Sequence, residues 1–311
     1  MSRIHRAVAT AAVLSSLAVL AACGEVKQQD ASEQPAGSNL RVTLGSKNFT
    51  ESQVMGELYK QALEQNGFQV VLRNNIGGTE VIDEQLQDGE IDAYPEYVGL
   101  AASAVAREDV LGKTAEETSK LARDYYASRG QVMSEETPFE NTESVAVTTL
   151  FAQTHRLRTI GDLRELKRFT FGARPEFEAR EQGFAGMQSV YRLTNATFVP
   201  VAVDARFIAL FEGDVDAGNV FSTDPQLGSG DYRVLEDTER LFGYQHVALV
   251  IGEDKLESLG GDRFMDVIDT VNEQLSQSTM IELNAAVDLD DRDPADVAEE
   301  FLKQRDLFTR E

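Results

Sequence analysis

The residues best suited to bind a ligand lie between Ile76 and Leu100, in the stretch IGGTEVIDEQLQDGEIDAYPEYVGL. Its Gly-Gly-Thr turn begins a predicted helix, so backbone N–H groups at Gly78 and Thr79 are placed to bind an anion or the polar end of a ligand. The stretch ends in an aromatic, acidic loop. In that loop, Tyr97 is the residue that we expect to contact a cation.

Further aromatic residues lie beside turn signals rather than only at the spacing of a core. The π faces of several such rings, closed around a quaternary ammonium group, would each contribute about 0.5–2 kcal/mol to binding. Most aromatic side chains fill cores, and we expect this role, or a mixed one, for three of them: Tyr94, Phe177 and Phe184. The remaining candidates for a cation site are Tyr97, Phe221 and Tyr244.

The sequence contains few of the motifs that enzymes use for catalysis. Beyond residue 22 the only histidines are His155 and His246, and neither lies in a metal-binding pattern. There is no nucleophile elbow and no phosphate-binding loop, and the acidic run 288–294 lacks the central glycine and closing glutamate of a calcium loop. We therefore expect no catalysis, no cofactor and no metal, and we interpret residues 288–294 as a helix-capping turn between helices near 262–277 and 294–304.

The first 22 residues are typical of a secretory signal peptide. A basic head with Arg3 and Arg6 precedes an apolar run that is too short to span a bilayer in the usual way. Cys23, the only cysteine, follows Leu-Ala-Ala as in a bacterial lipobox, whose cysteine is acylated. The sequence thus predicts a lipid anchor at Cys23 on the extracytoplasmic face of the cell membrane. The alternative is an ordinary secreted protein with one free thiol.

Residues 23–39 are polar and contain Pro and Gly, which predicts a flexible tether before a body that begins near Leu40. The formal net charge is −24. Removal of the signal peptide takes away Arg3 and Arg6 but no acid, so the charge becomes −26. A body of this charge is repelled by phosphate backbones, which argues against nucleic-acid binding.

Strand and helix patterns alternate along the body, which predicts an α/β fold. Residues 85–93 (QLQDGEIDA) and 209–217 (ALFEGDVDA) share a helix end, a glycine and a strand with one internal acid. Together with the repeated strand–helix order, this similarity favours two similar lobes. Ligands of such sheets bind at the carboxyl ends of strands, where loops 45–50, 94–100 and 173–186 are expected to gather.

Several motifs, in order along nearly the whole body, resemble one family. They are GSKNFTE at 45–51, GGTE at 77–80, DAYPEY at 92–97, FSTD at 221–224 and VAEEFL at 297–302. This pattern is similar to that of the substrate-binding proteins of osmoprotectant ABC transporters, the glycine betaine and choline binders of the ProX/OpuC type.

The resemblance implies a type II periplasmic-binding-protein fold with a hinged ligand cleft. Lobe 1 would comprise residues 40–143 and 247–311, and lobe 2 residues 144–246. It further implies a quaternary ammonium ligand, an ABC permease with separate ATPase subunits as partners, and membrane attachment through the lipid anchor. In this family an aromatic cage holds the ammonium group, and basic residues hold the carboxylate of betaine. The matching positions are Tyr97, Glu143, Phe221 and Tyr244 for the cage, and Lys47 and Arg180 for the carboxylate.

Three departures from the family pattern bear on the ligand. Leu100 replaces a threonine, Phe221 replaces a tyrosine, and Glu143 stands where an aromatic residue is expected. A buried glutamate beside the cage favours a cation and disfavours a ligand carboxylate, unless Arg180 neutralises it. The sequence therefore predicts choline or a related cation, with weaker binding of betaine. Open alternatives are a receptor for another polar metabolite such as an amino acid and, in a different class, an enzyme or a surface adhesin.

Overall fold

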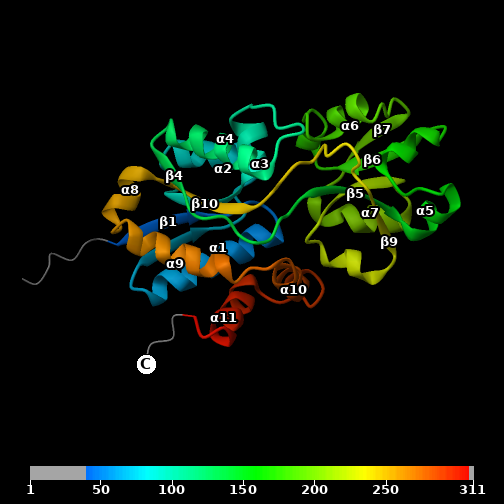
Figure 1. The fold of residues 1–311 in the computed structure, drawn as a ribbon. Coiled ribbons are helices and arrows are strands. Elements are labelled where there is room, and N and C mark those ends of the chain that lie inside the picture. The colour runs from blue at the N-terminus through cyan, green and yellow to red at the C-terminus, as the bar shows by residue number, and fades with distance from the viewer. Residues whose placement is uncertain (1–39, 308–311) are drawn as a thin grey trace, which may run out of the picture. The chain divides into compact units, whose positions relative to one another are not determined.

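A computed structural model describes residues 40–307 (Figure 1). The predicted signal peptide, Cys23 and the tether lie outside the described residues, so the lipid anchor stays a prediction. Within residues 40–307, no helix is both long and apolar enough to cross a bilayer. In the same range, no group of three or more His, Cys, Asp or Glu side chains could hold a metal ion.

The first of two mixed sheets has the strand order β2-β1-β3-β10-β4. β1 pairs in parallel with β2 and β3, whereas β10 runs antiparallel to β3 and β4. The last strand in the chain, β10, thus returns to the sheet built by the N-terminal segment. The strands are β1 (Arg41–Gly45), β2 (Gln69–Arg73), β3 (Ala93–Tyr97), β4 (Gln131–Met133) and β10 (Val247–Gly252).

Helices cover both faces of this sheet, and together they form the first lobe. Their apolar residues pack into two cores, one on each face of the sheet. One face carries α1 (Thr50–Gln65), α9 (Asp262–Glu273), α10 (Gln277–Asp288) and α11 (Pro294–Gln304). The other carries α2 (Thr79–Gln87), α3 (Val98–Leu100) with the π-helical turn Ala101–Val105, and α4 (Ala115–Ala127), and α8 (Glu253–Ser258) follows β10.

The second sheet, with the order β7-β6-β8-β5-β9, and its helices form the second lobe. β6 pairs in parallel with β7 and β8, and β5 runs antiparallel to β8 and β9. The strands are β5 (Glu143–Thr148), β6 (Phe169–Ala173), β7 (Ala196–Pro200), β8 (Ala217–Phe221) and β9 (Tyr232–Leu235). The helices are α5 (Thr149–His155), α6 (Phe184–Val190) and α7 (Arg206–Glu212), with short 3-10 turns at Ile160–Glu165, Pro175–Phe177, Val203–Ala205 and Pro225–Ser229.

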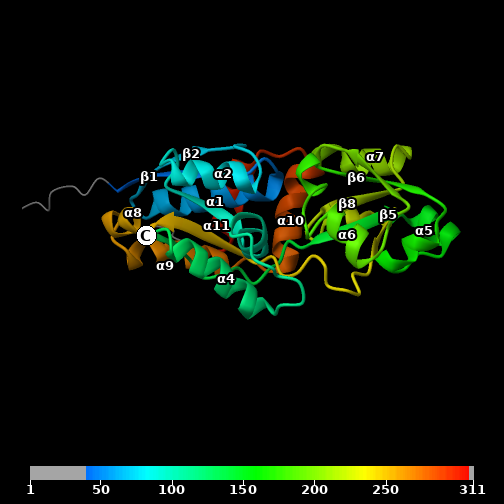
Figure 2. The ribbon, with the colours of Figure 1, turned by 90° about the horizontal axis from the view of Figure 1, so that it is seen from above.

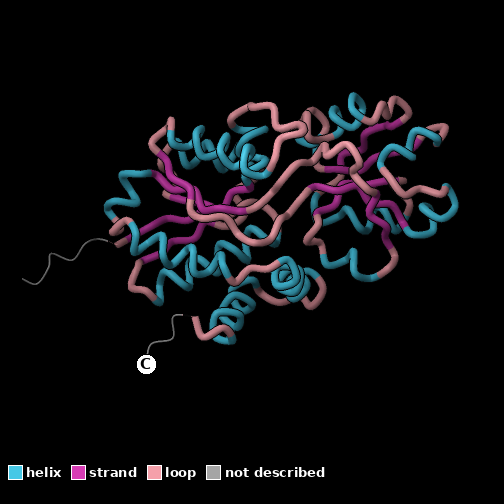
Figure 3. Tube along the Cα trace, in the orientation of Figure 1, coloured by secondary structure: helices cyan, strands magenta, loops and turns pink. Residues whose placement is uncertain are grey.

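Two crossing segments, 134–142 and 236–246, connect the lobes, and Figure 3 shows both as loops between the sheets. They lie side by side: Asn141 N–H donates to the carbonyl of Gln245 at 3.0 Å, and Glu140 forms an isolated bridge with His246. Helix α10, on one face of the first sheet, lies near the junction of the lobes in Figure 2 and contacts the 3-10 turn at Pro225–Ser229 of the second lobe. Two adjacent extended segments of this kind can serve as a hinge.

The similarity between residues 85–93 and 209–217 has a structural counterpart. In the first lobe, Thr43 N–H donates to Oδ2 of Asp92 at 2.7 Å, and in the second Thr170 N–H donates to Oδ2 of Asp216 at 2.8 Å. Each acid thus joins the first parallel strand of its lobe to the start of the next strand in the sheet. The two lobes have the same strand order, so the prediction of two similar α/β lobes is confirmed. The predicted capping turn is also confirmed, because the Asp293 side chain caps α11.

Candidate functional site

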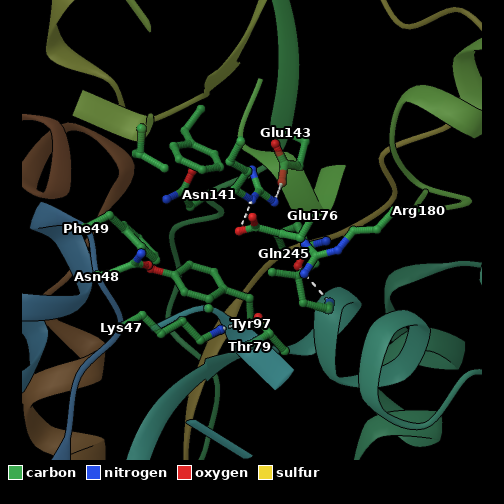
Figure 4. A pocket seen from close by; sticks show the side chains of 15 residues that line it. Lys47, Asn48, Phe49, Thr79, Tyr97, Asn141, Glu143, Glu176, Arg180 and Gln245 are labelled. Carbon is green, nitrogen blue, oxygen red and sulfur yellow. Dashed lines mark hydrogen bonds and ion pairs between the residues drawn. The ribbon is translucent and has the colours of Figure 1, made fainter. Parts of the chain in front are cut away.

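A small cavity lies where strand ends of both sheets meet (Figure 4). Its volume is about 40 Å³, which is room for a few water molecules at most. The lining residues are Lys47, Asn48, Phe49, Gly78, Thr79, Tyr97, Leu100, Asn141, Glu143, Arg174, Glu176, Arg180, Val203, Phe221 and Gln245. Since both lobes contribute to its walls, the cavity would widen if the lobes moved apart.

Three rings, Phe49, Tyr97 and Phe221, form an aromatic cluster along one side of this cavity. The centroid of Phe49 lies 5.8 Å from that of Tyr97 and 5.7 Å from that of Phe221. Phe49 therefore joins a ring at the end of β3 to a ring at the end of β8. In this arrangement the rings contact one another, so a ligand that enters between them must separate them.

Lys47 is buried beside the aromatic cluster, in the loop that follows β1. Its ammonium group pairs with Oε1 of Glu96, donates to Oγ1 of Thr79 at 2.9 Å, and lies 4.8 Å from the centroid of Tyr97. Burial lowers the pKa of Lys47, an effect that Glu96 opposes. The charge of Lys47 is therefore already balanced within the first lobe. Glu96 itself does not line the cavity.

Glu51, in the first turn of α1, holds three neighbours of the cavity in place. Its carboxylate accepts hydrogen bonds from the Tyr97 hydroxyl at 2.8 Å, from Asn141 Nδ2 at 2.7 Å and from Asn284 Nδ2 at 3.0 Å. Burial raises the pKa of Glu51, whereas these donors and Thr223 lower it. One carboxyl group thus links α1, β3, a crossing segment and α10.

Arg174, immediately after β6, neutralises Glu143. Its guanidinium pairs with Oε1 of Glu143, donates to Oδ1 of Asn219 at 3.0 Å and lies 3.2 Å from Oε1 of Glu176. Burial alone would lower the pKa of Arg174, but Glu143 and Glu176 raise it. Glu143 is therefore not an isolated negative charge beside the rings. The neutralising partner is Arg174, and Arg180 bonds elsewhere.

Arg180 binds the first lobe from the loop that precedes α6. One guanidinium nitrogen, Nη2, lies 2.8 and 2.9 Å from the two carboxylate oxygens of Glu80, near the start of α2. Its Nε is buried and has no hydrogen-bond partner among the described residues. Gly78 and Thr79 line the cavity at the same helix start, as Figure 4 shows for Thr79. A ligand anion could therefore bind at this end of the cavity.

Arg206 is a second basic side chain beside the aromatic cluster. Arg206, at the start of α7, lies 4.5 Å from the centroid of Phe221 and pairs with Asp224 at 3.1 Å. Lys47 lies over Tyr97 in a similar way, and both cations are paired with carboxylates, Lys47 with Glu96 and Arg206 with Asp224. Ring faces of this kind can bind a cation, and a ligand cation would meet them beside neutralised ion pairs.

The structure brings most of the predicted site residues together, with one exception. Lys47, Gly78, Thr79, Tyr97, Glu143, Arg180 and Phe221 all line the cavity. Tyr244, on a crossing segment, does not line it, and its role in a cage stays a prediction. The backbone of Tyr244 and the side chain of Gln245 instead crowd Gly99, where a β-carbon would collide with both. Leu100 lines the cavity, and its N–H donates to Gln245 at 3.2 Å.

Among the contributors to this site that sequence reasoning did not identify are Phe49, Glu51, Arg174 and Asn141. Phe49 and Glu51 lie inside the GSKNFTE motif, whose aromatic and acidic residues were a usable signal. Arg174 directly follows a predicted strand, at the position where ligand-binding loops start. Asn141 carried no signal, because its partner Glu51 is 90 residues away in the chain.

Curated proteins similar to this chain are transport proteins. The chain is 26% identical over 268 residues to an ergothioneine transport permease/ergothioneine binding protein of Helicobacter pylori, a match that covers 86% of the chain and 48% of that relative. It is 26% identical over 278 residues to a glycine-betaine-binding protein of Pseudomonas aeruginosa, covering 85% of the chain and 88% of the relative. Relatives of this kind are substrate-binding proteins rather than enzymes, in agreement with the prediction.

Solved structures agree on the fold. A glycine betaine/carnitine/choline ABC transporter protein superposes with a TM-score of 0.70 at 23% identity, over 86% of this chain and all of the other. Apo YehZ from Escherichia coli superposes with a TM-score of 0.62 at 24% identity, over 86% and 99% of the two chains. The predicted two-lobed periplasmic-binding-protein fold is thereby confirmed. Residues 41–304 match the sequence family described as the substrate-binding domain of ABC-type glycine betaine transport systems, and the chain therefore belongs to that family.

Proposed function

We propose that this protein captures a zwitterionic quaternary ammonium compound between its lobes and delivers it to an ABC permease. The observation that carries the proposal is the aromatic cluster of Phe49, Tyr97 and Phe221, which spans both lobes and has basic side chains at its edges. ATP hydrolysis would take place on separate subunits. Lipid attachment at Cys23 would keep the receptor close to its permease, because durable anchoring brings both to one membrane surface.

The aromatic cluster would bind the ammonium group. Lys47 and Arg206 already lie 4.8 and 4.5 Å from the centroids of Tyr97 and Phe221, so both rings can attract a cation. A trimethylammonium group has no N–H donors and is bound through ring faces rather than by hydrogen bonds. Opening at the crossing segments would separate the rings, and closure would desolvate the ligand between them.

The opposite end of the cavity would bind a carboxylate. Arg180 has a buried Nε without a partner among the described residues, and it lies near the N-terminus of α2. The cavity is lined by three basic residues (Lys47, Arg174 and Arg180) and two acids (Glu143 and Glu176). Because Arg174 pairs with Glu143, the reason for expecting a purely cationic ligand such as choline is removed. A ligand that carries both charges suits this lining better.

The names of the relatives support the same chemistry. Glycine betaine, carnitine and ergothioneine, which appear in those names, each combine a trimethylammonium group with a carboxylate. The chain is only about a quarter identical to these proteins. We therefore propose a class of compound rather than a single compound.

The test follows tyrosine fluorescence, since the chain has eight tyrosines and no tryptophan. Glycine betaine should give a saturable change at one site per chain. Glycine, which keeps the carboxylate and lacks the three methyl groups, should give none. Saturation by glycine with no response to its betaine would contradict the proposal and favour an amino-acid receptor.

A pair of tyrosine variants locates the site. Tyr97→Leu removes a ring of the aromatic cluster and should weaken glycine betaine binding about five- to thirtyfold, a loss of about 1–2 kcal/mol. Tyr244→Leu removes a ring that does not line the cavity and should leave affinity unchanged. The reverse pattern would place the cage at Tyr244 and overturn the assignment.

A further inference from the structure

The two lobes differ strongly in charge. Within the described residues, lobe 1 (40–143 and 247–307) has 14 Lys and Arg against 35 Asp and Glu, a formal charge of −21. Lobe 2 (144–246) has 11 against 14, a formal charge of −3. An anionic surface would therefore repel lobe 1 more strongly and turn lobe 2 towards itself. Because salt screens charges beyond about 10 Å at about 0.1 M, the residues on the facing side of lobe 2 decide the attraction.

Lobe 2 has a group of unpaired basic side chains along one edge. All six are exposed, and none forms an ion pair with a carboxylate among residues 40–307. At the cleft, by contrast, Arg174, Arg180 and Arg206 of the same lobe are paired with acids. We name the six residues the basic edge: Arg156, Arg158, Arg164, Lys167, Arg168 and Arg192.

Hydrogen bonds hold the parts of the basic edge together. Asn195 Nδ2 donates to the carbonyl of Leu163 at 2.9 Å and to the carbonyl of Leu166 at 2.7 Å. These bonds fasten the loop that carries Arg192 to residues 156–168, which carry the other five basic residues. The basic edge is therefore one region of the surface, although its residues come from two segments of the chain.

Neighbouring acids reduce this positive charge without cancelling it. Residues 156–168 contain five basic residues and two acids, Asp162 and Glu165. Residues 232–240, which adjoin them through the bridge between Thr159 and Glu236, add two arginines and three acids. With Arg192, the local formal charge is +3. A positive region of this size stands out on a body whose other lobe has a charge of −21.

An exposed leucine adjoins the basic edge. Leu150, in the first turn of α5, is 74% exposed, the highest value among the exposed large apolar side chains of the described residues. Helix α5 leads directly into the basic edge, since Arg156 follows its last residue. Surfaces that rest on phospholipid combine these two features: apolar groups enter the boundary of the acyl region, and basic groups stay beside the anionic headgroups.

The position of the basic edge favours a membrane over the permease as its partner. In Figures 1 and 2, α5 lies at the end of the body opposite to the start of β1, beyond the cleft. A permease must contact the mouth of the cleft to receive a ligand, which this far end of lobe 2 does not form. The predicted tether, residues 23–39, joins the body at β1. A lipid anchor alone would therefore leave lobe 2 free to swing.

We propose that the basic edge and Leu150 rest on the anionic phospholipid headgroups of the membrane that holds the lipid anchor. This inference rests on the proposed function, because attachment at Cys23 brings the body to the membrane. The anchor raises the effective concentration of lipid, so a weak attraction is enough to orient the body. The basic side chains bind headgroup phosphates, and Leu150 enters the interface. The receptor then presents its cleft to the permease in one orientation, with lobe 2 held against the lipid.

The test measures how closely lobe 2 approaches the lipid. The acylated protein is reconstituted on phosphatidylcholine vesicles with and without phosphatidylglycerol, and energy transfer is measured from a dye on α5 to labelled headgroups. Gln153→Cys, at an exposed position, provides the only free thiol for the dye, since acylation blocks Cys23. We expect transfer to rise at least about twofold on the anionic vesicles and to fall back in about 0.5 M salt. No rise, or a rise only on vesicles that contain the permease, would overturn the inference.

Charge reversal assigns the effect to the basic edge. A triple variant, Arg164→Glu with Lys167→Glu and Arg168→Glu, should abolish the rise. A matched control reverses the same amount of charge at exposed positions of lobe 1 and should keep the rise. An equal loss in both variants would show an effect of net charge alone and would overturn the inference. The control substitutions are Arg41→Glu, Lys120→Glu and Arg305→Glu.

A pair of leucine variants tests the apolar contact. Leu150→Ser should reduce the rise by about half, because the lipid interface loses an apolar side chain. Leu289→Ser, at a position of lobe 1 that is 56% exposed, should leave the rise unchanged. The same reduction in both variants would count against a contact at Leu150.

Failure of this inference can be told apart from failure of the proposed function. Every variant should bind glycine betaine as the unchanged protein does, because neither the basic edge nor Leu150 lines the cavity. If the unchanged protein binds no betaine but shows the rise on anionic vesicles, the proposed ligand is wrong and the membrane contact stands. If it binds glycine betaine and shows no rise, only the membrane contact is wrong. If it does not stay on vesicles at all, the lipid anchor and this inference fail together.

Discussion

The two lobes build their walls of the cleft from the same strand positions with different residues. β3 (Ala93–Tyr97) and β8 (Ala217–Phe221) occupy the same place in their sheets, and each ends in a ring of the aromatic cluster. The antiparallel neighbours also correspond, since Val247 of β10 pairs with Tyr97 and Glu143 of β5 pairs with Phe221. A repeated topology thus supplies two equivalent positions for binding a ligand from both sides.

The difference lies in how each wall balances its buried cation. In the first lobe, Lys47 pairs with Glu96 alone, and the two side chains are 2% and 0% exposed. In the second lobe, Arg174 shares its charge between Glu143 and Glu176. The planar guanidinium can bind several acceptors at once, whereas the ammonium group is a point charge. The comparison teaches that the sheet topology determines where the ligand-facing residues lie. The charge partners of these residues determine which ligand charges the cleft can accept.

The largest expected effect is a loss of stability that differs between the two ion pairs. Glu96→Ala leaves Lys47 buried without a carboxylate and should lower the free energy of unfolding by about 3–5 kcal/mol. Glu143→Ala should cost less, about 1–3 kcal/mol, because Arg174 keeps Glu176 and Asn219. Urea denaturation measures both. A larger loss in Glu143→Ala would mean that the second wall depends on one pair as strongly as the first.

The repeated acids should behave alike. Asp92→Ala and Asp216→Ala each remove the acceptor of a threonine N–H, and each should lower the free energy of unfolding by about 1–3 kcal/mol. Values that agree within about 1 kcal/mol would support equivalent roles in the two lobes. A loss confined to one variant would break the correspondence at these positions.

The two outer rings should contribute similarly to ligand affinity. Phe221→Leu should weaken binding of glycine betaine by about 1–2 kcal/mol, as Tyr97→Leu does, because each variant removes one π face. Tyr97→Phe keeps the ring and loses only the bond to Glu51, so its effect should be smaller than that of Tyr97→Leu. Calorimetry compares the variants. If Tyr97→Phe were as damaging as Tyr97→Leu, the hydroxyl rather than the ring would be the important group.

The smallest expected effect lies at the crossing segments. His246 Nε2 lies 3.2 Å from Glu140 Oε1, and the hydrogen bond with Glu140 raises the pKa of His246 above 6.5, whereas the bond to His246 lowers the pKa of Glu140 below 4.5. The stabilisation from His246 is complete below pH 6.5 and is lost as the pH rises through its raised pKa. That from Glu140 is complete above pH 4.5 and is lost as the pH falls through its lowered pKa.

The ion pair should therefore stabilise the protein between about pH 4.5 and 6.5 by less than about 1 kcal/mol, since both groups are partly exposed. Glu140→Gln should remove this contribution and return the pKa of His246 towards its ordinary value. Proton NMR can follow His246, with His155 as an internal reference. An unchanged His246 titration in the variant would show that the pair does not exist in solution.

The sequence predicted the parts of this protein that depend on local patterns. Alternating apolar residues and glycine stops were enough for an α/β fold with two lobes, and short motifs were enough for Lys47, Tyr97 and Phe221. The helix α10 was missed, and the site residue Asn284 with it, because α10 is only weakly amphipathic. Local patterns therefore identified the strands better than this helix near the junction of the lobes.

Long-range pairing could not be predicted. The sequence named Arg180 as the residue that would neutralise Glu143, whereas the partner is Arg174, which lies 31 residues further along the chain than Glu143. Glu51 appeared only as the last residue of the motif GSKNFTE, and only folding brings Tyr97, Asn141 and Asn284 to it. Both residues acquire their roles from contacts that no spacing in the sequence records. The preference for choline depended on an unneutralised negative charge at Glu143.

The most direct test of the central claim is parallel calorimetric titration of the purified protein with glycine betaine and choline. Both ligands carry the same trimethylammonium group, and only glycine betaine has a carboxylate for the Arg180 end of the cavity. We predict one site per chain and at least about tenfold tighter binding of glycine betaine, a difference of about 1.4 kcal/mol. Tighter binding of choline would contradict the account and restore the cationic ligand that the sequence first indicated.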